Sequence, residues 1–111
     1  MFLYKFKNEF KSLSISFDNF FANIIITIFL IIINNIINNK IFEIVANVCE
    51  VEVASITETS TIGDFPQWDS VGHLTILTNI EEAFDITFEP EEMMDIEDVN
   101  DIIEAVKDKL K

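Results

Sequence analysis

The chain has one cysteine, Cys49, and one histidine, His73, among its 111 residues. A lone cysteine cannot form an internal disulfide, which fits a reducing, cytoplasmic setting. Without a cluster of His and Cys, the sequence gives little support to a zinc site or to a Ser/His/Asp or Cys/His catalytic set. With only two glycines it also lacks a Gly-rich phosphate loop. We therefore expect no metal site and no catalytic residues, and the chain is not predicted to be an enzyme.

Positive charge is scarce in the second part of the chain. Residues 41–111 hold three Lys against eighteen Asp and Glu, a net charge of −15, whereas residues 1–40 hold four Lys against two acids, a net +2. Nucleic-acid affinity comes mainly from Lys and Arg that displace counterions, so nucleic acid is excluded as a partner of the acidic part. Such a field instead steers a domain toward basic patches on partner proteins.

A long apolar stretch covers residues 20–37 and has no charge. Its length is borderline for crossing a bilayer, and Asn residues at 23, 34 and 35 interrupt it. Lysines at 5, 7 and 11 lie upstream, as a cytoplasmic-side charge bias requires. No small-residue cleavage site follows the stretch, which disfavours a cleavable signal peptide. Three alternatives stay open for the extension 1–38: an over-extended start, a membrane segment, or an extra helix on the domain.

Residues 39–111 are predicted to form one small all-α domain, a bundle of three main helices and one short helix with a long first loop. Asn39 is the expected N-cap of the first helix, whose apolar face continues to Val51 or Ala54. The second helix begins at Asp69 or Ser70 and ends at Asp85, after the loop 55–68. Its expected inward stripe is Val71, Leu74, Leu77, Ile80 and Phe84.

Two further helices complete the expected bundle. Pro90 suits the first position of a short helix, and Asp98 is the expected cap of the last one, with Asp101 three residues on. Three lysines at the C-terminal end of the last helix match its dipole. Met93 and Met94 are expected to fill the core beneath the short helix. The pattern requires no strands.

The segment Asp69-Ser70-Val71-Gly72-His73-Leu74, which opens a helix directly after a long loop, resembles the Asp-Ser-Leu signature of acyl and peptidyl carrier proteins. The resemblance covers Asn39 to Leu110 and includes the helix order, the long loop and the acidic charge. It implies a 4′-phosphopantetheine group attached through a phosphodiester to Ser70, added by a separate transferase from coenzyme A with magnesium. It also implies that Asp69 helps to position the magnesium and the transferase. The chain would then carry acyl or aminoacyl cargo as a monomer.

The resemblance also implies partner contacts and a cargo cavity. The second helix would dock basic patches of acyl-loading and acyl-transfer enzymes through Val71, Glu81 and Glu82. Trp68 is either an apolar plug over the bundle or an exposed contact for a partner. His73 is expected at the surface. The acyl chain is expected in a cavity lined by Val48, Leu74, Leu77, Ile80, Met94, Ile96 and Ile103.

Departures from fatty-acid carriers lie close to the serine. Gly72 and Thr75 stand where such carriers often have acids, and Trp68 replaces a small residue. The variant is more similar to stand-alone carriers of specialised pathways, such as those that modify a glycan or a secondary metabolite. It specifies neither the cargo nor the pathway.

Two other classes of protein compete with the carrier hypothesis. A calcium loop over residues 95–100 is disfavoured because Val99 and Asn100 stand where an oxygen ligand and a Gly are required. The second class is a membrane-tethered acidic adaptor without a prosthetic group, which predicts that Ser70 is never modified.

Overall fold

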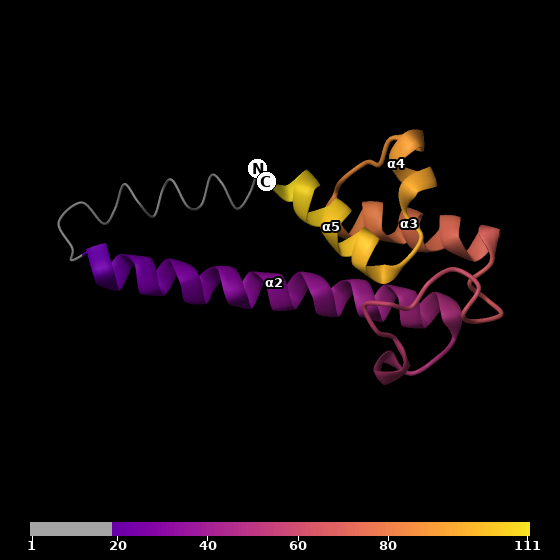
Figure 1. Cartoon of the computed structure of the whole chain (residues 1–111), viewed down its shortest axis with the longest axis horizontal. Helices are drawn as coiled ribbons and strands as arrows, with labels where there is room; N and C mark the ends of the chain where they lie inside the picture. The colour runs from indigo at the N-terminus through magenta and orange to yellow at the C-terminus, as the bar shows by residue number, and fades with distance from the viewer. Residues whose placement is uncertain (1–18) are drawn as a thin grey trace.

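The structure is a computed structural model that describes residues 19–111. Within that range it has four α-helices and one 3-10 turn, with no strand beyond an isolated bridge between Thr61 and Asp98 (Figure 1). In chain order these are α2 (Asn19–Cys49), η1 (Val53–Ser55), α3 (Ser70–Phe84), α4 (Pro90–Asp95) and α5 (Val99–Leu110). The expected all-α bundle with three main helices, a short one and a long first loop is confirmed.

Helix α2 is much longer than expected, since it runs for 31 residues. Asn39 lies inside this helix, so its prediction as an N-cap was wrong. The apolar residues before it contain neither Gly nor Pro, and nothing in them stops a helix. The boundary at residue 38 stays a prediction, and the helix crosses it without a break.

The end of α2 was also misplaced by the apolar pattern. The helix stops at Cys49 because Glu50 takes a left-handed conformation with φ of 58°. Val51 N then donates to Ala46 O at 3.1 Å and Glu50 N to Asn47 O at 3.3 Å, the paired bonds of a Schellman motif. Ala54 consequently belongs to η1 and is exposed.

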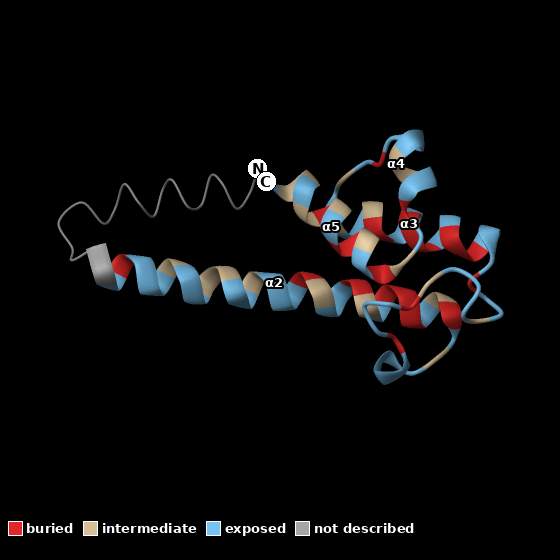
Figure 2. Cartoon of the chain, viewed as in Figure 1, coloured by how far each residue is buried: buried red, intermediate tan, exposed pale blue. Residues whose placement is uncertain are grey.

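The core lies where the C-terminal part of α2 packs against α3 and α5 (Figure 2). Each helix contributes fully buried apolar side chains: Ile41, Val45 and Cys49 from α2, Ile76, Leu77 and Ile80 from α3, and Val99, Ile102 and Val106 from α5. Burial raises the pKa of the Cys49 thiol, which keeps it protonated at neutral pH. Cys49 is thus a small core residue, as expected.

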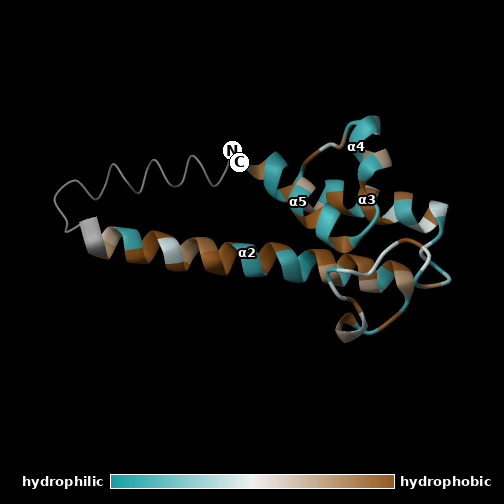
Figure 3. Ribbon diagram, viewed as in Figure 1, coloured by the Kyte–Doolittle hydropathy of each residue, from teal (hydrophilic) through white to brown (hydrophobic). Residues whose placement is uncertain are grey.

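The N-terminal half of α2 extends beyond the bundle (Figure 1). Its apolar side chains are largely exposed, as a comparison of Figures 2 and 3 shows. By length and composition alone, the stretch Phe21–Cys49 could cross a membrane, and only 11% of its most apolar 18-residue window is buried.

The long loop is fixed to the start of α5 by backbone hydrogen bonds. Ile62 N donates to Glu97 O at 3.1 Å, and Val99 N donates to Ser60 O at 2.9 Å. Of the isolated apolar residues in the loop, Ile56 is buried and Phe65 is partly buried, whereas Ile62 is exposed. Backbone pairing therefore holds this loop as much as apolar burial does.

The last two helices begin as expected. Pro90 occupies the first turn of α4, and the Asp98 carboxylate accepts a hydrogen bond from Asp101 N at 2.8 Å. Lys109 near the end of α5 binds Glu92 of α4 at 2.7 Å. Met93 packs against the core, but the expectation of core packing was wrong for Met94, which is 81% exposed.

Candidate functional site

The site is built at the start of α3, where the long loop ends. Asp69 is the N-cap, and its Oδ1 accepts a hydrogen bond from Gly72 N at 2.8 Å. Ser70 is the first residue of the helix and is exposed. Of the two predicted caps, Asp69 is therefore the one that caps, which leaves the Ser70 side chain at the surface.

This position suits a phosphate ester. The first N–H groups of a helix lack partners within the helix and carry partial positive charge, so they stabilise a negative group placed there. Helix α3 has 15 residues, enough for a substantial dipole. The exposed hydroxyl of Ser70 can be reached by an enzyme, and the residues present thus fit a phosphodiester-linked group.

A buried polar bridge fixes the loop just before the serine. Trp68 is fully buried, and its Nε1–H donates to Nδ1 of His73 at 3.0 Å. Nε2 of His73 lies 2.9 Å from the carbonyl oxygen of Ile96. Because the indole can only donate and the carbonyl can only accept, His73 is the neutral tautomer with its proton on Nε2. The bridge joins the loop, α3 and the segment between α4 and α5.

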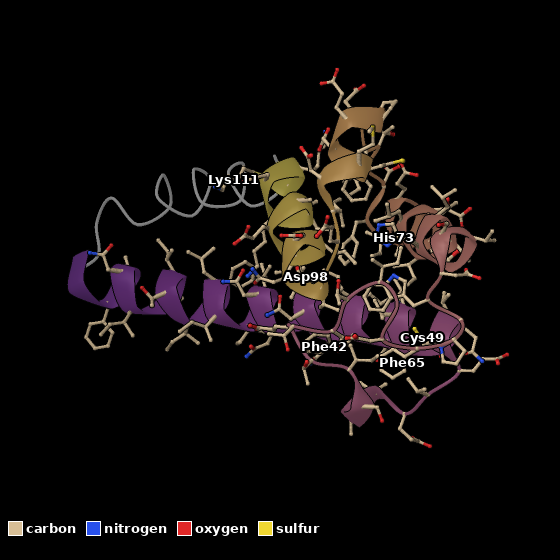
Figure 4. The ribbon with its side chains drawn as sticks, turned by 45° about the vertical axis from the view of Figure 1, so that its right-hand side comes forward. Phe42, Cys49, Phe65, His73, Asp98 and Lys111 are labelled. Atoms are coloured by element: carbon tan, nitrogen blue, oxygen red, sulfur yellow. The ribbon has the colours of Figure 1, made fainter. Side chains whose placement is uncertain are left out.

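Two predictions are corrected by this bridge. His73 was expected at the surface but is buried, and its ring lies inside the bundle (Figure 4). Trp68 was offered as a contact for partners, but full burial leaves it unable to touch one. The alternative, in which Trp68 is a plug that closes the loop over the bundle, is the one the structure shows.

The inward face of α3 follows the expected stripe at Leu77, Ile80 and Phe84 but departs from it in the first turns of the helix. Gly72, His73 and Ile76 are buried, whereas Val71 is 73% exposed and Leu74 is 56% exposed. A Cβ atom on Gly72 would lie 1.9 Å from the carbonyl oxygen of Gln67, so only glycine lets the loop approach here. The expected stripe was based on apolar side chains alone. The first turns of α3 instead pack through a glycine and a histidine, which an apolar pattern does not include.

The predicted cavity residues are divided between core and surface. Leu77, Ile80, Ile96 and Ile103 belong to the core cluster, and Val48 packs against it. Leu74 and Met94 are exposed, so in this structure neither faces the interior, and their assignment to the cavity was wrong. For the other five, a role in holding an acyl chain stays a prediction.

The two predicted docking acids occupy different environments. Glu82 is exposed, whereas Glu81 is half-buried and its Oε2 accepts a 2.8 Å hydrogen bond from Phe88 N. Glu81 thus holds the connector after α3. Glu82 and the apolar surface of Val71 are available to a partner.

Among residues 19–111, no group of three or more His, Cys, Asp or Glu side chains is arranged to hold a metal ion. The Asp and Glu residues of the domain are exposed or partly exposed.

The chain matches a protein-family model. A family model described as a phosphopantetheine attachment site matches residues 39–106, which is more than half of the chain. The match runs from the middle of α2 into α5 and includes Asp69 and Ser70. No curated protein matches the chain.

Proposed function

Because this chain belongs to the phosphopantetheine attachment family, whose members are non-catalytic carriers of a 4′-phosphopantetheine group, we propose that Ser70 bears this group. Cargo, an acyl or aminoacyl unit, is held as a thioester on the thiol of the group and presented to partner enzymes. The single observation that carries the proposal is the exposed Ser70 at the first position of α3.

The chain's own residues account for how such a serine would work. Asp69 caps the helix and so sets the first turn, whose N–H groups favour the phosphate charge. Trp68 and His73 fix the loop before the serine, which limits its freedom before a transferase binds. The family resemblance adds a role for Asp69 in positioning magnesium and the transferase.

Partner docking is proposed on the outer face of α3, close to Ser70. Val71 offers apolar surface one residue from the serine, and Glu82 offers charge further along the same helix. The net charge of −15 over residues 41–111 favours encounter with basic surfaces of the transferase and of the acyl-loading and acyl-transfer enzymes.

We further propose a cytoplasmic location and a specialised pathway. The buried, protonated thiol of Cys49 is consistent with a reducing compartment. Gly72, which packs against the loop, and Trp68, which is buried beneath it, distinguish the region around the serine from that of fatty-acid carriers. The acidic adaptor without a prosthetic group is disfavoured, because the family match is to a prosthetic-group attachment site.

Intact-mass measurement tests the attachment site. The chain is incubated with coenzyme A, magnesium and a broad-specificity phosphopantetheinyl transferase, and one adduct of the mass of phosphopantetheine is expected. Ser70→Ala should abolish the adduct, whereas Ser55→Ala, at another exposed serine, should retain it. An adduct that persists in Ser70→Ala, or none in the unaltered chain, would contradict the proposal.

Charge reversal tests the docking face. Glu82→Lys should slow modification at low salt, and the difference should shrink as salt rises, because screening weakens charge steering. Glu58→Lys makes the same charge change at an exposed position of the loop, away from α3, and should have the smaller effect. Equal slowing by both variants would indicate that net charge, rather than this face, guides the encounter.

A further inference from the structure

We propose that the N-terminal half of α2 inserts into a lipid bilayer and that α2, continuous from bilayer to core, is a rigid stalk for the carrier domain. The exposed segment is defined here as residues 21–32, together with the outward side of Ile36. It lies beyond the bundle (Figure 1). The inference goes beyond the proposed function and does not depend on which serine is modified.

The exposed segment presents large apolar side chains to solvent. Phe21 is 62% exposed, and the same segment exposes five isoleucines before residue 33: Ile24, Ile25, Ile28, Ile31 and Ile32. Water is an unfavourable environment for a continuous apolar surface of this kind. A core helix of a soluble protein would be covered by other elements, whereas this segment is largely bare (Figures 2 and 3).

The apolar residues of the exposed segment are distributed around most of the helix. A second copy of the chain would require one apolar stripe, with polar residues on the opposite face. Apolar side chains instead cover most of the circumference of residues 21–32, and the two polar residues of this segment, Asn23 and Thr27, lie four residues apart on one side of the helix. The Thr27 hydroxyl donates to Asn23 O at 2.8 Å, so this polar group is satisfied within the helix itself. Such a surface fits lipid better than a protein partner.

The length of the exposed segment fits insertion into a bilayer. Residues 21–32 span about 18 Å at 1.5 Å per residue, which exceeds half of a hydrocarbon core about 30 Å thick. From Ile33 onward the helix begins to pack against the bundle, with Ile37 buried. The exposed polar residues Asn39 and Lys40 follow, and a lysine is suited to the headgroup region. Insertion up to the edge of the bundle would therefore cover the exposed segment.

The charge distribution of the bundle agrees with this orientation. The lysines of the described residues are Lys40, at the start of the packed part of α2, and three at the end of α5: Lys107, Lys109 and Lys111. In Figure 1 the C-terminal end of α5 lies on the side of the bundle from which the exposed half of α2 extends, and Lys111 marks this end in Figure 4. Lys109 and Lys111 pair with Glu92 and Asp108. Because its lysines offset nearby acids, the C-terminal end of α5 should be repelled by anionic headgroups less than the rest of this acidic domain.

The rigid connection has a consequence for the proposed attachment serine. Gln67, three residues before Ser70, donates through Nε2 to Glu50 Oε2 at 3.1 Å. Ser70 therefore lies near the end of α2 that is opposite to the exposed segment. Residues 37–49 of the helix rise by about 20 Å, which would hold the serine at roughly this height above the bilayer surface. The prosthetic group would face water and soluble parts of partner enzymes.

Vesicle flotation tests the inference with the full chain. Vesicles of phosphatidylcholine with a minor fraction of phosphatidylglycerol are mixed with the protein without detergent and centrifuged through a density gradient. We expect the protein to float with the vesicles. Ile28→Asp places a charge in the exposed segment and should reduce partitioning about 100-fold, because a carboxylate is costly in the hydrocarbon core. Val53→Asp, at an exposed apolar residue of η1, should float as the unaltered chain does.

Three results would overturn the inference: an unaltered chain that stays at the bottom of the gradient, a lipid-free stable dimer that fails to float, or a natural chain that begins after residue 37. Ser70 modification is measured on each variant by intact mass, together with helical content by circular dichroism. Flotation that is lost in Ile28→Asp while the adduct is retained supports the stalk. Loss of the adduct with flotation intact would contradict only the proposed function.

Discussion

The indole Nε1–H of Trp68 donates a 3.0 Å hydrogen bond to Nδ1 of His73, five residues further along the chain. The two rings lie nearly parallel, with an interplanar angle of 19° and centroids 6.2 Å apart. Since Nε2 of His73 lies against Ile96 O, the pair connects three segments that meet near Ser70. Both side chains are buried, so their polar atoms depend on each other.

Replacement of Trp68 by Phe should lower the free energy of unfolding by about 1–3 kcal/mol, because Nδ1 of His73 would lose its buried donor. Urea unfolding followed by circular dichroism measures the change. Gln67→Ala, at an exposed neighbour, should cost less than about 0.5 kcal/mol. If Trp68→Phe were as stable as the unaltered chain, the hydrogen bond to His73 would contribute nothing to the fold.

Gly72→Ala should destabilise the domain by about 1–3 kcal/mol, although alanine ordinarily favours a helix over glycine. The added methyl would lie 1.9 Å from Gln67 O, a backbone atom that must move. Thermal unfolding measures the change, and Thr78→Ala on the exposed side of α3 is the matched control, expected to be neutral or slightly stabilising. An increase in melting temperature for Gly72→Ala would show that the loop accommodates the methyl easily.

Substitutions at Asp69 separate helix capping from help to the transferase. Asp69→Ala should cost about 0.5–2 kcal/mol through loss of the cap to Gly72 N, whereas Asp69→Asn retains an oxygen acceptor and should cost less. If the carboxylate also serves the transferase, both variants should slow Ser70 modification.

Asp98→Ala is the control for the Asp69 variants, because Asp98 caps α5 in the same way through Asp101 N at 2.8 Å. It should lose a similar amount of stability without slowing modification. Unchanged modification in Asp69→Asn would restrict Asp69 to a capping role. Rates are measured by intact mass at early times, under conditions where every variant is folded.

The contact between Glu92 and Lys109 predicts a pH effect. The hydrogen bond from Lys109 lowers the pKa of Glu92 below its ordinary value of 4.5, with help from the backbone N–H of Glu89. Because the pKa is lower in the folded state, the stabilisation is present above pH 4.5 and is lost as the pH falls through the folded-state pKa. Glu92→Gln should remove this part of the pH dependence of the melting temperature.

Glu91→Gln, at the exposed neighbour of Glu92 in α4, is the control for that titration. Melting temperatures of the three proteins are compared from neutral pH down to the acid transition. The difference between Glu92→Gln and the unaltered chain should narrow with acidification, and the Glu91→Gln curve should remain closer to that of the unaltered chain. A difference that widened at low pH would have the wrong sign for a lowered pKa.

Much of the architecture follows from local chemistry that is visible in the sequence. Asp69, Asp85, Pro90 and Asp98 mark helix ends through capping geometry and the restricted backbone of proline, and the structure has a helix end at each. The four-helix domain and its family could be predicted from those signals together with the Asp-Ser step. The prediction of an N-cap at Asn39 was wrong, because a residue that can cap a helix does not interrupt one when the residues on both sides are helical.

Capping, charge and apolar periodicity are local properties, so an acidic helical domain with a serine after a capping aspartate could be predicted from the sequence. The carrier role was implied by the resemblance of the Asp-Ser segment to carrier proteins. The inward-facing residues in the first turns of α3 depend instead on tertiary packing. Gly72 admits the Gln67 carbonyl, and His73 finds two hydrogen-bond partners from distant segments, so a glycine and a histidine are buried where Val71 and Leu74 were expected. The burial of these two residues depends on close packing between residues far apart in the chain, which a local sequence pattern cannot predict.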